Sequence, residues 1–248
     1  MEPVRLKVLS TGTITLALLI GAGFLSGAGA WLVPSVTLVL LAIFALGWPR
    51  LLALPAPLPV SLVIFVVSAA ATLLGLWGPG GPSLLWVAPG LGVGIILMFL
   101  TQLVRGTDAQ KRLDSVAVGS AGMLIASCGA GWAVLGAQPG GPTLALMAGI
   151  GIMGAAIPAA TRLPDRIVFP LGFIVAVLAG GAASLLSDEV SLPVAMVVGA
   201  LCGLVVVGAR AMITSLGGPK SFTQILAAAL APLLVAGSVT WYVLLLLL

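Results

Sequence analysis

The residues of this chain that could do chemistry are few, and most of them gather in one short segment. Arg105, Asp108, Lys111, Arg112 and Asp114 lie together between two long apolar stretches. Cationic side chains bind lipid phosphates and paired carboxylates hold Mg²⁺, so an enzyme that modifies lipid phosphates is one interpretation. The basic residues between the aspartates would neutralise them, which favours a solvated loop. A third interpretation is contact of Arg105, Lys111 and Arg112 with anionic lipid headgroups at the inner face.

A second acidic feature is the adjacent pair Asp188-Glu189, in a short polar connection. Two carboxylates could position a metal ion or a sugar for transfer to or from a lipid. Neighbouring side chains in a short turn point in different directions, which weakens that idea. We interpret the pair as part of a solvated turn.

Several common kinds of site are excluded by residues that the sequence lacks. The chain contains no histidine, which excludes zinc sites with histidine ligands and haem with an axial histidine. No P-loop is present, and the long apolar stretches contain no carboxylate or lysine that could relay protons. Cys128 and Cys202 fall inside apolar stretches, where they are expected to serve as packing residues. The sequence therefore favours a protein with no enzyme activity, no catalytic residue, no metal ion and no cofactor over the lipid-phosphate-modifying enzyme.

The composition is that of a membrane protein. Of 248 residues, 61% are hydrophobic and only 6% are charged, and the mean hydropathy is +1.30. About a quarter of the residues of a soluble domain are charged, so this chain has too few charged residues to form a hydrated surface. Most of its side chains must instead face lipid or neighbouring helices.

Nine apolar stretches are long enough to cross the hydrocarbon core, which takes about 17 to 25 helical residues. The predicted spans are 11–27, 31–47, 58–77, 84–104, 116–136, 144–160, 167–187, 192–209 and 225–247. We therefore expect an all-α, polytopic integral membrane helix bundle of about nine transmembrane helices. It would form a single transmembrane domain over residues 1–248.

The ten basic residues are distributed so that all of them can face one side of the membrane. They are Arg5, Lys7, Arg50, Arg105, Lys111, Arg112, Arg162, Arg166, Arg210 and Lys220. They occupy the N-terminus and every second connection. The positive-inside rule then predicts a multi-pass protein of the cell (cytoplasmic) membrane, with the N-terminus cytoplasmic and the C-terminus extracytoplasmic. Nucleic-acid binding is not expected, because it requires a clustered basic surface.

Tryptophan and glycine suggest where the spans end and how they pack. Five tryptophans fall near predicted outer ends and Trp48 falls near an inner end, as expected for the headgroup layer. Glycines at short spacing let helix backbones approach closely. They occur as the pairs Gly23/Gly27, Gly90/Gly94 and Gly199/Gly203, and as the group Gly149, Gly151 and Gly154. We expect these glycines to form packing faces inside one bundle.

Two further patterns concern the arrangement of the spans. The motif Pro-Gly-Gly-Pro occurs at 79–82 and again at 139–142, which suggests four parallel hairpin repeats plus a closing helix. The alternative is that proline and glycine recur at turns for local reasons. Pro89, next to Gly90, lies inside the fourth predicted span and is a candidate kink or hinge. Pro232 and three other prolines lie nearer the predicted span ends.

The chain resembles permease-type polytopic membrane proteins of high-GC Gram-positive bacteria. The resemblance rests on spans rich in Ala, Gly, Val and Leu, on only three lysines, and on short Pro-Gly outer turns. It covers the whole chain but includes no specific motif, so it assigns no functional residue.

Three functions are compatible with these observations. The first is a permease that transports or flips a lipid or another weakly polar solute, alone or as a membrane subunit. The second is a non-catalytic scaffold or assembly subunit of an envelope membrane complex. The third, with the least support, is the lipid-phosphate-modifying enzyme. The expected partners are membrane lipids, anionic lipids at the inner face, and either another membrane protein or a second copy of the chain.

Overall fold

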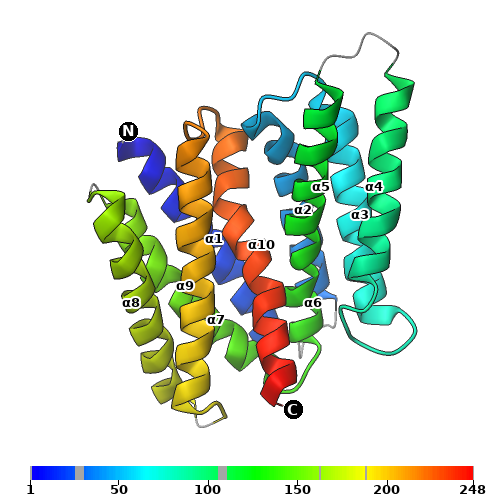
Figure 1. The fold of residues 1–248 in the computed structure, drawn as a ribbon. Helices are drawn as coiled ribbons and strands as arrows, with labels where there is room; N and C mark the ends of the chain where they lie inside the picture. The colour runs from blue at the N-terminus through cyan, green and yellow to red at the C-terminus, as the bar shows by residue number, and fades with distance from the viewer. Residues whose placement is uncertain (1, 26–30, 106–110, 162, 188, 248) are drawn as a thin grey trace.

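The structure is a computed structural model, which describes residues 2–25, 31–105, 111–161, 163–187 and 189–247. All regular elements in these ranges are helical (Figure 1). They are α1 (Glu2–Phe24), α2 (Leu32–Leu51), α3 (Pro57–Trp77), α4 (Val87–Val104), α5 (Arg112–Cys128), α6 (Ala130–Gly136), α7 (Gly141–Ala160), α8 (Asp165–Ala183), η2 (Ser184–Leu186), α9 (Leu192–Ser215) and α10 (Phe222–Leu247).

The all-α prediction is confirmed. In the described ranges, nine helical segments are long and apolar enough to cross a membrane, one for each predicted span. The fifth span consists of two helices, α5 and α6, which meet at Gly129. A side chain at Gly129 would collide with Leu234 of α10, so the break lies where a neighbouring helix approaches closely.

Several helices extend further than the apolar stretches suggested, and α1 and α9 do so by the most residues. Helix α1 begins at Glu2 rather than near residue 11, so Arg5 and Lys7 lie on the helix and not in a preceding tail. Helix α9 continues past residue 209 to Ser215, so Arg210 also lies on a helix. Hydropathy detects the segment that matches the hydrocarbon core, whereas a helix can continue into the headgroup layer.

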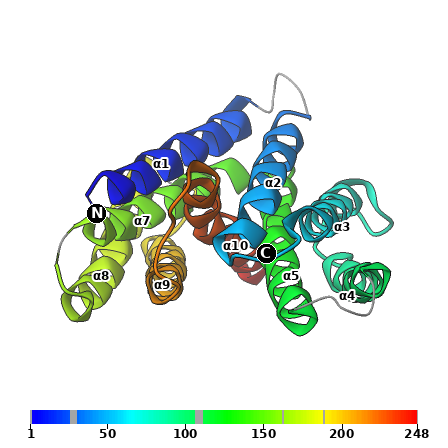
Figure 2. The same ribbon diagram turned by 90° about the horizontal axis from the view of Figure 1, so that it is seen from above.

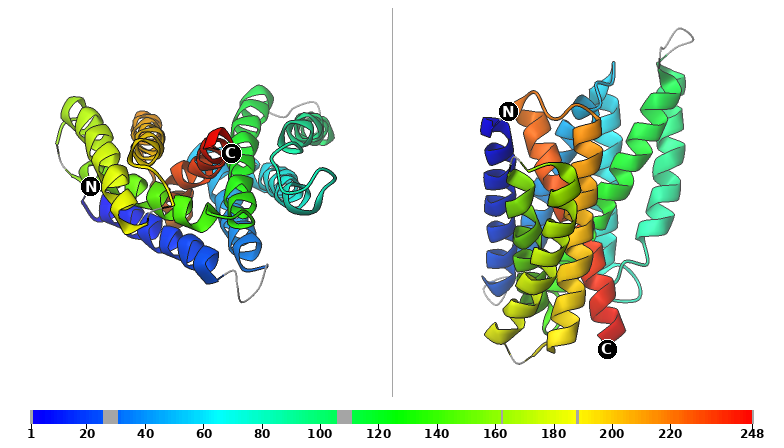
Figure 3. Two further views of the ribbon diagram at one scale, coloured as in Figure 1. Left: turned by 90° about the horizontal axis from the view of Figure 1, so that it is seen from below. Right: turned by 60° about the vertical axis from the view of Figure 1, so that its left-hand side comes forward.

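The helices form two groups joined by a central helix. Helices α7, α8 and α9 pack closely on one another, and α2 to α5 form a second group. Helix α10 lies between them and contacts α1, α2, α5, α6, α7 and α9 (Figure 2). Helix α1 runs along one side and packs on α7 and α10 (Figure 3). Helix α4 has the smallest buried share of the nine spans and packs mainly on α3 and α5.

This packing follows the predicted hairpins only in part. Helices α8 and α9, which would form the fourth hairpin, pack closely on each other, whereas α7, the second member of the third, packs mainly on α8 and α9. Four hairpin repeats, suggested by the Pro-Gly-Gly-Pro turns at 79–82 and 139–142, stay a prediction.

Glycine contacts hold the group of α7, α8 and α9 together. A side chain at Gly151 would meet the backbone of Gly199, and a side chain at Gly180 would also meet Gly199. A side chain at Gly154 would collide with Ala179. These glycines allow three helix backbones to touch, which confirms the predicted packing faces on the sixth and eighth spans. Gly90, by contrast, faces open space.

The described basic residues all lie at one end of the bundle, which we call the charged end. It contains the start of α1, the ends of α2, α4 and α9, and the starts of α5, α8 and α10 (Figure 1). Glu189 and the end of α10 lie at the opposite end. Arg162 and Asp188 fall outside the described residues.

Three of the six tryptophans pack inside the bundle rather than on its outer surface. Trp48, Trp132 and Trp241 are buried in the bundle. The indole N–H of Trp48 donates to the carbonyl of Val118 at 2.9 Å, and that of Trp132 donates to the carbonyl of Leu233 at 2.7 Å. These indoles therefore link helices. Trp31 and Trp77 are exposed at the opposite end, with their ring centres 4.4 Å apart.

Candidate functional site

The candidate site begins at the carboxyl end of α7. The helix ends at Ala160, and Thr161 adopts an extended conformation. The hydroxyl of Thr161 donates back to the carbonyl of Pro158 at 2.7 Å. The last carbonyl groups of a helix have no partner inside it and carry the negative end of the helix dipole. This end therefore attracts cationic donors.

Two arginines from distant parts of the sequence supply those donors. Arg5, on the second turn of α1, donates from Nη1 to the carbonyl of Thr161 at 2.7 Å. Arg210, near the end of α9, donates from Nη1 to the carbonyl of Ala159. The Nη2 atom of Arg210 also donates to the carboxylate of Asp165 at 2.9 Å.

The burial of this ion pair is uneven. The side chain of Arg210 is 10% exposed, whereas that of Asp165 is 49% exposed. The Nε atom of Arg210 is buried and has no hydrogen-bond partner among the described residues. Water screens the half-exposed carboxylate, so Asp165 neutralises the positive charge of Arg210 only in part.

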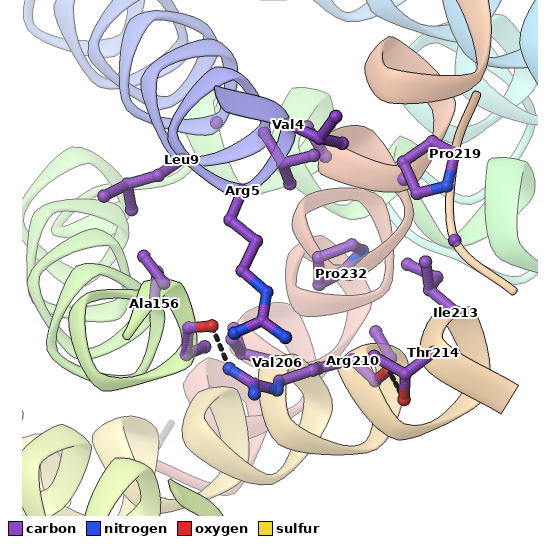
Figure 4. A pocket seen from close by; sticks show the side chains of 18 of the residues that line it. Val4, Arg5, Leu9, Ala156, Val206, Arg210, Ile213, Thr214, Pro219 and Pro232 are labelled. Carbon is purple, nitrogen blue, oxygen red and sulfur yellow. Dashed lines mark hydrogen bonds between the residues drawn. The ribbon is translucent and has the colours of Figure 1, made fainter. Parts of the chain in front are cut away.

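The two arginines line a cavity of about 480 Å³, which we call the arginine cavity. Its walls are residues 4–13 of α1, 152–160 of α7, 206–214 of α9 and 228–233 of α10, with the turn 217–219 and Asp165 near the charged end. Figure 4 shows the side chains of Arg5 and Arg210 reaching from α1 and α9 into the same part of the cavity. Small-molecule sites typically have roughly 300–1,000 Å³, so this cavity has the size of a ligand site.

The cavity is deep and divided by polarity. Leu233, at its deep end, lies eleven residues after Phe222, which corresponds to about 16 Å along α10. That is roughly half of a hydrocarbon core about 30 Å thick. The deep wall is mostly apolar, with Ile152, Met153 and Val206, whereas the charged groups lie toward the charged end.

Pro232 forms part of the α10 wall, in the interior of that helix. Proline has no N–H group, so it cannot donate to the carbonyl of Ala228, which lines the same cavity. The sequence pattern suggested that Pro232 lies nearer a span end. The earlier start of α10 and its long apolar continuation place it in the helix interior instead.

Beyond the cavity, small residues close the space between its walls. Gly149 of α7 contacts Leu16 and Ile20 of α1, and Gly151 contacts Gly199 of α9. Cys202 of α9 lies beside Thr240 of α10, with Sγ and Oγ1 4.0 Å apart. These contacts close the deep end of the cavity near the middle of the helices.

The sequence-predicted lipid contacts lie elsewhere, at the charged ends of α4 and α5 (Figure 1). Arg105 follows α4 and donates to Gln102 at 2.7 Å and to Ser115 at 3.3 Å, so it joins the two helices. Lys111 is exposed, with φ of 55°. Arg112 is half-buried, and its Nε atom has no partner among the described residues.

These three residues do not line the arginine cavity, and their contact with lipid headgroups stays a prediction. Asp108 lies outside the described residues, and Asp114 is exposed on the first turn of α5. The structure therefore does not bring the two aspartates together in a site that it describes.

Pro89 is the third residue of α4, which begins at Val87. The N–H groups of a first helical turn have no partner inside the helix, so a proline there removes no hydrogen bond. The sequence placed Pro89 in the interior of a span, where a proline kinks the helix. Because α4 begins only at Val87, Pro89 lies in its first turn, and this reason for expecting a kink at Pro89 and Gly90 is absent.

The sequence pattern did not indicate a site at Arg5, Arg210 or Asp165. It placed Arg5 at the N-terminus and Arg210 in a connection, because each lies at the edge of an apolar stretch. A signal was present in the isolation of Arg210, which follows an apolar run and precedes Met212 and Ile213. Only the packing of α1, α7 and α9 brings the three residues together.

Comparison of the chain with protein-family models, with curated proteins and with solved structures finds no match.

Proposed function

We propose that this multi-spanning membrane protein is a permease that binds a weakly polar, amphipathic solute in the arginine cavity and moves it across or between the leaflets. The observation that supports this most directly is the cavity itself. It extends about 16 Å along α10 from the charged end, with an apolar deep wall. Such a cavity suits a molecule with a hydrocarbon portion and a polar head.

The closed deep end of the cavity supports a transport cycle with two states. The walls are apart at the charged end and in contact at residues 149–151, where glycines meet neighbouring helices. Contacts of this kind depend on close approach and dispersion rather than on ion pairs. A second state, with these contacts separated, would open the cavity toward the opposite end.

Gly12 offers a direct test because it lines the cavity and a side chain added there meets no atom within 4 Å. Gly12→Leu should fill the cavity without disturbing the fold. Gly21→Leu is a matched control, since Gly21 lies on the same helix, also faces open space, and does not line the cavity. Both changes raise helix propensity by a similar amount.

The measurement uses proteoliposomes that contain a fluorescent single-chain lipid in one leaflet, with transfer followed by a membrane-impermeant quencher. We expect wild-type protein and Gly21→Leu to speed transfer, and Gly12→Leu to slow it strongly. Equal rates in protein-free liposomes and wild-type proteoliposomes would reject the permease function for this class of solute.

A scaffold function is the second candidate, and α4 is the observation that favours it. This helix is the least buried span, and side chains added at Gly90 or Gly92 would meet no atom within 4 Å. A partner helix could approach closely along this face. Purification in mild detergent would separate the two functions. A stable partner protein that is lost in Gly92→Leu, together with no lipid transfer, would favour the scaffold.

A further inference from the structure

We propose that the solute is a single-chain amphiphile with an anionic head, a carboxylate or a phosphate, and that Arg5 and Arg210 bind this head together. This inference rests on the proposed function and names its substrate class. Its first support is that two guanidinium groups lie in the same part of one cavity (Figure 4). Like charges in one cavity repel, and an anion placed near both removes that repulsion.

The charges of the described lining residues do not balance. Arg5 and Arg210 contribute two positive charges, and Asp165 contributes one negative charge from a half-exposed position. An anionic oxygen is the acceptor that a guanidinium group binds best. The cavity therefore has an excess positive charge that one anionic head would neutralise.

The size and lining of the cavity limit the rest of the molecule. A volume of about 480 Å³ lies in the lower half of the range for drug-sized ligands. One hydrocarbon chain fits this volume, whereas a phospholipid with two long chains does not. The deep wall near Ile152, Val206 and Leu233 is apolar and suits that chain.

Both arginines also have a structural role, because they donate to carbonyl groups at the end of α7. Such hydrogen bonds need a donor, but they do not need a full positive charge. Glutamine keeps a donor and removes the charge, so Arg5→Gln and Arg210→Gln separate the two roles. Arg166→Gln is the matched control, since Arg166 is exposed at the same end and does not line the cavity.

The ligands for the test share one chain length and differ in the head. Hexadecanoate and hexadecyl phosphate are the two anions, and hexadecanol is the uncharged control. Binding to the full-length protein, delipidated in mild detergent, is measured by titration calorimetry. We expect both arginine variants to bind the anions roughly tenfold more weakly, with hexadecanol unchanged and Arg166→Gln like wild type. A preference for one anion identifies the head as carboxylate or phosphate.

Asp165→Asn provides a test with the opposite sign. If Arg210 binds an anion, removal of the competing carboxylate should strengthen anion binding severalfold. If the ion pair serves only to hold α8 and α9 together, Asp165→Asn should behave like Arg210→Gln. Should Arg210→Gln fail to fold, Arg210→Lys keeps the positive charge but not the planar fork, and an intermediate loss of anion binding is expected.

The outcomes separate this inference from the proposed function. Equal affinity for hexadecanol and the two anions, or anion binding that neither arginine variant alters, would overturn the anionic head and leave the permease function standing. No binding of any of the three amphiphiles, together with no lipid transfer, would overturn both.

Discussion

Arg5 and Arg210 donate hydrogen bonds to the carbonyl groups of Thr161 and Ala159, at the carboxyl end of the same helix. One arginine comes from the start of the first span and the other from the end of the eighth. Their meeting point is the negative end of the α7 dipole, which is what attracts both guanidinium groups. The same arrangement places two positive charges at one end of a deep, largely apolar cavity.

The first prediction concerns the stability of this helix end. Arg210→Ala removes donors to Ala159 and Asp165 and should lower the free energy of unfolding by about 1.5–3 kcal/mol, as for hydrogen bonds of charged groups. Thermal unfolding in detergent measures the change. Arg166→Ala, at an exposed position, should stay within about 0.5 kcal/mol of wild type. Equal effects of the two changes would contradict a structural role of Arg210.

The second prediction concerns the contact of α8 and α9. A side chain at Gly199 would collide with the backbone of Ala176 and Gly180. Gly199→Ala should therefore destabilise the protein by roughly 1–3 kcal/mol, because two backbones must separate. Gly208→Ala on the same helix meets no atom within 4 Å and should be neutral or slightly stabilising. Unfolding in a denaturing detergent compares the two variants.

The third prediction distinguishes buried from exposed tryptophans. Trp132→Phe leaves the carbonyl of Leu233 without the indole donor and should cost about 1 kcal/mol or more of stability. Trp31→Phe should cost less, since the Trp31 side chain is 64% exposed. Quenching by a spin label in the headgroup layer should affect Trp31 strongly and Trp132 weakly. Strong quenching of Trp132 would show that its ring faces lipid.

The fourth prediction concerns the orientation in the membrane, which the charge pattern predicts. In a background with Cys128 and Cys202 replaced by alanine, single cysteines at Lys111 and Lys220 should react with an impermeant thiol reagent from the cytoplasmic side. A cysteine at Glu189 should react from the other side. The helix directions already place Lys111 and Lys220 at one end of the bundle and Glu189 at the other. Labelling of Lys111→Cys and Lys220→Cys from opposite sides would contradict the predicted topology.

Each predicted span corresponds to a helical segment. In lipid the backbone N–H and C=O groups of a single apolar segment can be paired only within the segment, and the helix is the structure that pairs them. The hydropathy pattern failed at the ends of helices, where α1 and α9 extend into more polar sequence. That failure hid the site, since Arg5 and Arg210 lie in these extensions and were assigned to loops. Pro89 was misplaced for the same reason, because the start of α4 could not be located from composition.

The order of residues alone determined that this chain is a helical membrane protein and which end of each helix carries charge. Both follow from the sequence of each span by itself, because each span must satisfy its own backbone in lipid and keep its charges at its ends. Tertiary structure decided which spans are neighbours, since contacts between apolar helices depend on shape and not on hydrophobicity. The glycines at 151, 180 and 199 bring α7, α8 and α9 together, and that packing brings Arg210 and Asp165 to the end of α7. The arginine cavity exists only through that arrangement.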